Sequence, residues 1–209
     1  MLAWLTRALL MVSAPLFLVA CGSDNDPPAS SVNSISQQAT AANYTAFNSA
    51  AAKADLTTTL NDPSANVTVF IPTNAAFDSF AGRLGFASAA ALVEALPAAA
   101  LRSVLLYHVV PGTLRAAELQ AGGASQPTQH TLNGQPARLA LDFSNGVRIT
   151  DAVLTQATVT AADTVTRNGV IHEIDKVLVP PGVLNLVQMA QLNPDFSSLV
   201  SAVVQTDLA

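Results

Sequence analysis

The chain has 209 residues, carries a formal net charge of −5 and contains one cysteine. Because lysine and arginine form no cluster along it, nucleic acid is not an expected partner, and charge alone would not hold the chain to an anionic lipid surface. A single cysteine excludes an intramolecular disulfide, so a packed core must supply the stability, and 50% of the residues are hydrophobic.

The first 20 residues have the pattern of an export signal. Arg7 is the only charged residue among them, and the apolar run that follows it is too short for a helix that crosses a bilayer. A basic start, a short apolar stretch and small residues together predict a secretory signal, residues 1–20, that is removed.

Cys21 ends this run in the sequence LVACG, which resembles the bacterial lipobox. The resemblance implies cleavage before Cys21 and attachment of lipid to it; the other reading is an ordinary signal peptide followed by an unpaired cysteine. Residues 21–31 are small and polar and contain prolines, which predicts a flexible tether. We therefore expect an exported protein, lipid-anchored to the outer membrane or cell surface, whose domain faces the periplasm or the exterior.

Helical patterns begin after the tether. Tyr44, Phe47 and Ala51 recur at helical spacing in an alanine-rich stretch, which predicts an amphipathic helix. Helical character returns between residues 87 and 108, with a break near Pro97.

A strand and a capped helix are predicted between these two helical stretches. Residues 67–71 are β-branched and aromatic, which predicts a strand that Pro72 ends. Thr73 or Asn74 then supplies the N-cap of a short helix that includes Phe77.

After residue 112 the pattern changes to alternating strands. Asn-Gly pairs separate these strands, and such pairs accept the positive φ angles of tight hairpins. The pairs are Asn133-Gly134, Asn145-Gly146 and Asn168-Gly169. Helices followed by hairpins predict an α+β fold with an antiparallel sheet.

Three blocks resemble the fasciclin (FAS1) domain family, and their order and spacing agree with it. The blocks are residues 68–77 (TVFIPTNAAF), 105–112 (LLYHVVPG) and 168–178 (NGVIHEIDKVL). The resemblance covers residues 32–181 and implies an antiparallel β-wedge or sandwich flanked by helices, in a family of mostly secreted or surface-anchored adhesion and matrix modules. The motif positions that it assigns to the framework of the fold are Thr68, Asn74, Phe77, Tyr107, His108, Gly169, His172 and Asp175. One mild departure is Ala75, which stands where an acidic residue is common in the family.

Residues 182–209 carry part of the same pattern again. Residues 196–199 align with 44–47, and residues 207–208 with 55–56, both at an offset of 152 residues. An offset of domain size predicts that this segment begins a second, truncated FAS1 unit. The other reading is a C-terminal helix that packs on a single domain.

Tyr107 and His108 are expected to be buried. His108 shares a helical face with Val104 and Leu105, so we expect a hydrogen-bonded ring rather than a catalytic one. Tyr107 is expected to be a packed ring with a satisfied hydroxyl, although by resemblance the Tyr-His motif is tied to adhesion in some animal members. His130 precedes a hairpin turn and is expected in an exposed loop or at a strand edge.

His172 is also expected to be buried, because it alternates with Val170 and Ile174 along a strand. A buried imidazole needs a partner for each ring nitrogen, and we expect the two motif histidines to share a polar network. The alternative is a metal pair of His172 with a carboxylate such as Asp175. Alternation places Asp175 on the opposite side of the strand, so no metal is expected.

Signatures of enzymes are missing from the sequence. It contains no G-x-S-x-G, H-E-x-x-H, P-loop or G-x-G-x-x-G motif, and its only cysteine is assigned to the anchor, so no catalytic residue and no cofactor are expected. Resemblance and anchor together predict a surface-tethered interaction module for cell adhesion or envelope and matrix contacts. Its expected partners are the membrane, through Cys21, and an unknown protein or glycan. The alternative is a carrier of a lipophilic small molecule in an apolar cleft between helices and sheet.

Overall fold

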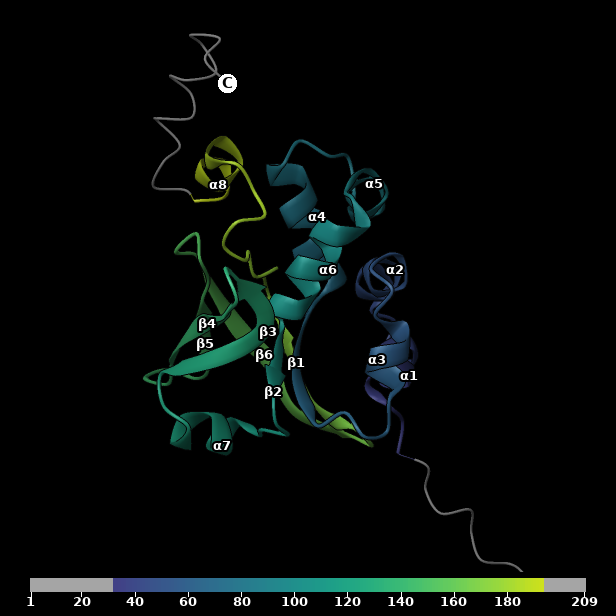
Figure 1. Ribbon diagram of the computed structural model, residues 1–209, viewed down its shortest axis with the longest axis vertical. Helices are drawn as coiled ribbons and strands as arrows, with labels where there is room; N and C mark the ends of the chain where they lie inside the picture. Colours follow the sequence, from purple (N-terminus) through teal and green to yellow (C-terminus); the bar gives the residue numbers. More distant parts are fainter. Residues whose placement is uncertain (1–31, 194–209) are drawn as a thin grey trace, which may run out of the picture. The chain divides into compact units, whose positions relative to one another are not determined.

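The computed structural model describes residues 32–193, which form a mixed sheet flanked by helices (Figure 1). The helices are α1 (Ile35–Ala41), α2 (Thr45–Lys53), α3 (Thr57–Asn61), α4 (Asn74–Arg83), α5 (Ala89–Ala95), α6 (Ala98–Tyr107), α7 (Ala116–Ala121) and α8 (Leu186–Leu192). The strands are β1 (Val67–Pro72), β2 (Val109–Pro111), β3 (Ser125–Leu132), β4 (Gln135–Asp142), β5 (Arg148–Thr150), β6 (Gln156–Thr166) and β7 (Gly169–Ile174). The fold is α+β, as predicted; the predicted signal and tether, with Cys21, lie outside the described residues.

The strands lie in the order β2-β1-β7-β6-β5-β4-β3. Neighbouring strands pair antiparallel except β1 and β7, which run parallel. The prediction of an antiparallel sheet is wrong for this pair, because Asn-Gly turns report only pairings between strands that are close in the chain. The sheet curls so that its two end strands, β2 and β3, lie side by side (Figure 1).

Two hydrophobic clusters lie on the two faces of β1, because successive side chains of a strand point to opposite sides. Val69 and Ile71 belong to the larger cluster, to which helices α1–α6 contribute their apolar faces. Phe70 belongs to the smaller cluster, inside the curl of the sheet, with Leu139 and Ile149. Every residue of β1 is buried, which agrees with its apolar sequence.

The helices begin and end near the predicted signals. The Thr73 hydroxyl accepts a hydrogen bond from the backbone N–H of Ala76 (3.1 Å), so Thr73, rather than Asn74, is the N-cap of α4. Pro97 separates α5 from α6. Among the described residues no single helix is long and apolar enough to cross a membrane; α5 and α6 meet the length and composition criteria only together, as a pair bent by 119°.

The three Asn-Gly pairs all join neighbouring strands, but they do so in two ways. Asn133 and Gly134 have φ angles of 53° and 78°, as a tight hairpin requires, and Gly146 has a φ of 79°. Asn168 and Gly169 have no positive φ, so the conformational reason that we gave for this third pair is wrong.

Gly169 is required for a different reason, namely the close approach of β1 to β7. It is paired with Val67, and a Cβ atom at this position would lie 1.9 Å from the carbonyl oxygen of Val67. Since a backbone atom of a central strand cannot move away cheaply, only glycine fits here.

Asn168 connects the turn between β6 and β7 to the helices. Its side chain is buried; Oδ1 accepts from the backbone N–H of Ile35 (2.9 Å), and Nδ2 donates to the carbonyl oxygens of Leu60 (2.9 Å) and Asp62 (3.0 Å). One amide thus joins the start of α1 and the end of α3 to the sheet, with each hydrogen bond contributing about 1 kcal/mol to stability.

The helix α8 packs against α4 at the C-terminal end of the described residues. The side chain of Leu192 is buried, and the Arg83 guanidinium donates to the Leu192 carbonyl (2.7 Å). A capping box of Asn185 and Gln188 begins α8, as one of Ser34 and Gln37 begins α1. Residues 196–199 and 207–208, on which the predicted second unit depends, lie outside the described residues.

We expect Gly169→Ala to lower the free energy of unfolding by about 3 kcal/mol or more, because the new methyl group would meet the carbonyl oxygen of Val67. Urea denaturation measures this change. Gly82→Ala is the matched control: it lies in α4 with nothing within 4 Å of the added Cβ, so it should raise stability by about 0.5 kcal/mol. Equal stability of the Gly169→Ala variant and the original chain would contradict this account of the strand pair.

Candidate interaction site

Tyr107 is buried at the end of α6, as its sequence context predicts. Its hydroxyl donates to the carbonyl oxygen of Arg138 (3.1 Å), and its ring meets that of His130 edge to face with 6.2 Å between centroids. Burial raises the pKa of the Tyr107 hydroxyl, so it stays neutral. The hydroxyl does not reach the surface and cannot contact a partner directly.

His130 lies in β3, an end strand of the sheet, but its side chain is buried, so the prediction of an exposed loop is wrong. Its Nε2 lies 3.3 Å from the carbonyl oxygen of Pro181, and Tyr107 covers its ring. The sequence placed it correctly before a hairpin turn but could not show that the curl of the sheet brings Tyr107 and Pro181 over this strand.

His108 is fully buried, and both of its ring nitrogens are bonded to the backbone. Nδ1 lies 2.7 Å from the carbonyl oxygen of Val104, and Nε2 accepts from the backbone N–H of Leu178 (2.9 Å). Because Nε2 accepts, the ring is neutral and carries its proton on Nδ1. Burial lowers the pKa of His108 from its ordinary value of 6.5 to about 4.

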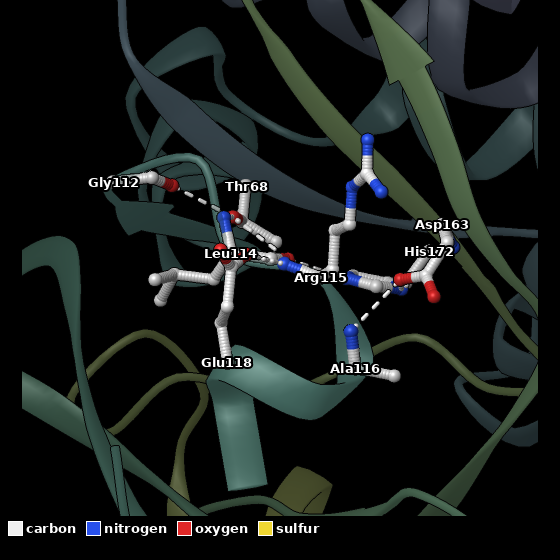
Figure 2. Close-up of polar contacts among 8 residues, drawn as sticks. All are labelled: Thr68, Gly112, Leu114, Arg115, Ala116, Glu118, Asp163 and His172. Carbon is white, nitrogen blue, oxygen red and sulfur yellow. Dashed lines mark hydrogen bonds and ion pairs between the residues drawn. The ribbon is translucent and has the colours of Figure 1, made fainter. Parts of the chain in front are cut away.

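His172 is likewise buried, in β7, but its partners differ from those of His108. Nε2 donates to the carbonyl oxygen of Leu114 (2.9 Å), and Nδ1 accepts from the backbone N–H of Asp163 (3.3 Å) (Figure 2). The expected polar network shared by the two motif histidines is therefore wrong, because each ring bonds to separate backbone groups.

The Asp163 carboxylate lies 3.9 Å from Nδ1 of His172, but the two groups do not form an ion pair near neutral pH. Burial lowers the pKa of His172, so its ring is neutral there. The contact of His172 with Asp163 depends instead on the backbone hydrogen bond.

Thr68 and His172 together fix the segment that leaves β2 (Figure 2). The Thr68 hydroxyl donates to the carbonyl oxygen of Gly112 (2.7 Å) and accepts from the backbone N–H of Leu114 (2.7 Å). His172 holds the carbonyl oxygen of the same Leu114. Residues 112–114 are thus held by side chains of β1 and β7, and α7 follows directly; the sequence pattern gave no indication of this short helix.

Asp163 is exposed and has a φ of 62°, an uncommon conformation for a residue other than glycine. The β6–β7 register shifts between Ala161 and Thr164, so Asp163 lies in a bulge of β6. Its carboxylate accepts from the backbone N–H of Ala116 (2.8 Å) at the start of α7. The bulge and α7 therefore hold each other in place.

Exposed side chains of different character lie on the two segments that the Asp163–Ala116 hydrogen bond joins. Arg115, next to Ala116, is exposed, and in Figure 2 its guanidinium extends away from the bonded groups. Val165 is 48% exposed, and Thr113 is also exposed. We call Thr113, Arg115, Asp163 and Val165 the bulge surface. Sequence reasoning missed all four, because Thr113 and Arg115 lie in a connection without periodicity and the bulge at Asp163 interrupts the alternation of β6.

The remaining motif residues have structural contacts. Asn74 bonds α4 to the start of α2, and the Phe77 side chain is buried in the larger hydrophobic cluster. Asp175 is exposed, and its carboxylate accepts from the backbone N–H of Thr158 (2.7 Å). Because both ring nitrogens of His172 are already bonded, a metal pair of His172 with Asp175 gains no support, and residues 32–193 contain no group of three metal-ligating side chains. Cys21, the predicted lipidation position, lies outside the described residues.

We expect His108 to make the protein less stable in acid. The unfolded ring takes up a proton as the pH falls through 6.5, whereas the folded ring takes one up only near pH 4, so protonation favours the unfolded state across this window. The loss from His108 between pH 7 and 4 should be roughly 3 kcal/mol, and His172 acts in the same direction.

Denaturation at a series of pH values checks this. His108→Gln should be less stable at pH 7 but should show a shallower decline toward pH 4, because glutamine does not titrate. Tyr107→Phe is the control, since it removes a buried hydroxyl that does not titrate in acid, and its decline should match that of the original chain. Stability that declines equally with falling pH in His108→Gln and in the original chain would contradict the low pKa of buried His108.

Comparisons with known proteins place these features in a family. A model of the fasciclin domain matches residues 42–180. Protein sll1483 of Synechocystis sp. is 36% identical over 126 residues, which cover 54% of this chain and 55% of that protein. The chain therefore spans about half the length of this curated relative.

A solved structure is also similar, a FAS1 domain pair from the insect cell adhesion molecule fasciclin I. It matches with a TM-score of 0.42 and 21% identity, over 68% of this chain and 46% of that one. The family match begins after α1, which Asn168 nevertheless bonds to the sheet. Since the fasciclin-domain model matches more than half of the chain, the chain belongs to the fasciclin (FAS1) domain family.

Proposed function

We propose that this FAS1 domain is a surface-tethered, non-catalytic interaction module that makes adhesive or envelope contacts through the bulge surface. The observation that supports this most is the division of roles between buried and exposed groups. Tyr107, His108 and His172 are buried and bonded internally, while the bulge surface presents exposed groups on a backbone that His172 helps to fix.

The bulge surface is held in its conformation before any partner arrives. Thr68 and His172 bond the backbone before Arg115, and Asp163 is bonded on both its backbone N–H and its carboxylate. A partner therefore need not order this backbone, which reduces the entropic cost of binding.

The composition of the bulge surface favours a protein as the partner. Arg115 and Asp163 offer charges of opposite sign, and the half-exposed Val165, two residues after Asp163 in β6, offers a small apolar contact. Such a mixture suits a polar protein interface with few apolar anchors, because opposite charges on the partner can pair with both groups.

The predicted export signal and lipidation position support the same role. We propose that Cys21 carries the lipid and holds the domain at the cell envelope, with the domain facing the periplasm or the exterior. The repeated residues at an offset of 152, together with the similar capping boxes of α1 and α8, support a second FAS1 unit that begins after residue 181. Two linked domains would increase the strength of attachment by multivalency.

The alternative, a carrier of a lipophilic molecule, gains little from the hollows in the domain. The hollow between α4, α8 and the end of β7 has a volume of about 40 Å³, and another, between α2, α4 and α5, has about 280 Å³ and several hydroxyl groups in its walls. The first is too small for a lipophilic ligand, and the second is open and partly polar.

The attachment of cells that display the chain tests the main proposal. Arg115→Ala and Val165→Thr should each reduce attachment several-fold without a change in melting temperature, because both side chains are exposed. Lys176→Ala, another exposed cation outside the bulge surface, is the control and should leave attachment unchanged. Cys21→Ala should release the protein from the envelope and abolish attachment; full attachment by cells carrying the released form would oppose the proposal.

A separate measurement tests the carrier alternative. We expect protein purified from its native host to contain no extractable apolar ligand and to have no visible absorbance. Organic extraction followed by mass spectrometry checks this, with an equal mass of chain denatured and refolded before extraction as the blank. A ligand recovered in stoichiometric amount would favour the carrier over the interaction module.

A further inference from the structure

An open hollow of about 280 Å³ lies between α2, α4 and α5, on a different part of the domain from the bulge surface. We call it the helix groove. Small side chains create it: Ala46 in α2 and Ala89 and Ala90 in α5 leave space where larger residues would fill it. Its residues are not part of the bulge surface, so the two sites can be tested independently.

Asn74 fixes one wall of the helix groove. The sequence predicted only a structural role for this motif residue. Its Oδ1 accepts from the backbone N–H of Ala46 (3.1 Å) and from the Thr45 hydroxyl (3.2 Å). Its Nδ2 donates to the carbonyl oxygen of Asn43 (2.9 Å). These three bonds join α4 to the start of α2.

Asp78 fixes the other wall. One of its carboxylate oxygens accepts from the backbone N–H of Ala89 (2.9 Å), which joins α4 to the start of α5. The side chain is nevertheless exposed and lines the groove. With both walls bonded to α4, the groove keeps its shape without a ligand, which lowers the cost of binding.

The groups that face the helix groove both accept and donate hydrogen bonds. The Ser88 hydroxyl accepts from the backbone N–H of Ala91 (3.2 Å) and keeps its own proton for donation. Ser49 adds an exposed hydroxyl, and Asp78 adds a carboxylate oxygen. Groups of this kind match ligand hydroxyls, because a hydroxyl donates and accepts at the same time.

The rest of the lining is apolar. Ala46, Ala89 and Val93 contribute methyl groups between the polar positions. A sugar ring combines these two characters, since its C–H faces pack on methyl groups while its hydroxyls bond to the rim. Asp78 is the one ionised side chain among the described residues of the lining, so its negative charge disfavours sulfated or uronic-acid sugars.

We infer that the helix groove binds a neutral saccharide, held by the Ser49 and Ser88 hydroxyls and the Asp78 carboxylate over a floor of methyl groups. A peptide amine that pairs with Asp78 is the competing occupant. The two differ in their dependence on salt, because an ion pair weakens with ionic strength whereas neutral hydrogen bonds do not.

Binding of neutral trisaccharides to the full chain in detergent micelles tests the inference. The probes are cellotriose, mannotriose and chitotriose, measured by calorimetry at low and high salt. At least one should bind, with an affinity that changes little with salt. No binding by all three, or affinity that falls steeply with salt, would overturn the saccharide assignment.

Two variants locate the binding to the helix groove. Ser49→Phe should weaken it by about tenfold or more, because the ring would fill the hollow from an exposed position of α2. Thr58→Phe, at an exposed position of α3 outside the groove, should leave it unchanged. Equal loss in both variants would place the sugar elsewhere and overturn the inference.

Asp78→Asn separates the two occupants further. Asparagine retains an oxygen that can accept from Ala89, so the wall stays in place while the charge is removed. A bound saccharide should lose only a few-fold in affinity, whereas a bound amine would be lost. Saccharide binding is measured by calorimetry, whereas the role of the bulge surface is measured by cell attachment. A negative result in one assay therefore does not decide the other proposal.

Discussion

The parallel contact of β1 with β7 is the constraint on which the rest of the domain depends. It exists because Gly169 has no side chain to meet the carbonyl oxygen of Val67. Next to it, Asn168 bonds the same turn to α1 and α3, and further along the pair Phe70 stacks on His172 with 5.5 Å between ring centroids. The helical layer and the curled sheet are therefore joined along one pair of strands.

The same two strands also position the bulge surface. Thr68 in β1 and His172 in β7 together hold the backbone of Leu114, Thr68 through its N–H and His172 through its carbonyl oxygen. His172 further accepts from the backbone of Asp163, so one neutral imidazole links two chain segments far apart in sequence. The motif residues thus act on the surface through backbone groups, without reaching it themselves.

Local signals in the sequence predicted local structure well. Pro72 ends β1, Pro97 separates two helices, and the spacing of His108 showed its burial, because each depends on a few neighbouring residues. The parallel pairing, the burial of His130 and the left-handed backbone of Asp163 depend on contacts between distant segments. Neither periodicity nor turn propensity reports such contacts, so the candidate site had to be found from the structure.

The left-handed residue in β6 has a consequence for how copies of the domain behave beside one another. Within the described residues β5 pairs with β6 only at 156–158, so the strand edge along residues 160–165 has no neighbour from the sheet. A straight edge of this length could add a strand from another molecule and start aggregation. The kink at Asp163 breaks the regular spacing of N–H and carbonyl groups along this edge, which disfavours the addition of such a strand when copies of the domain lie close together.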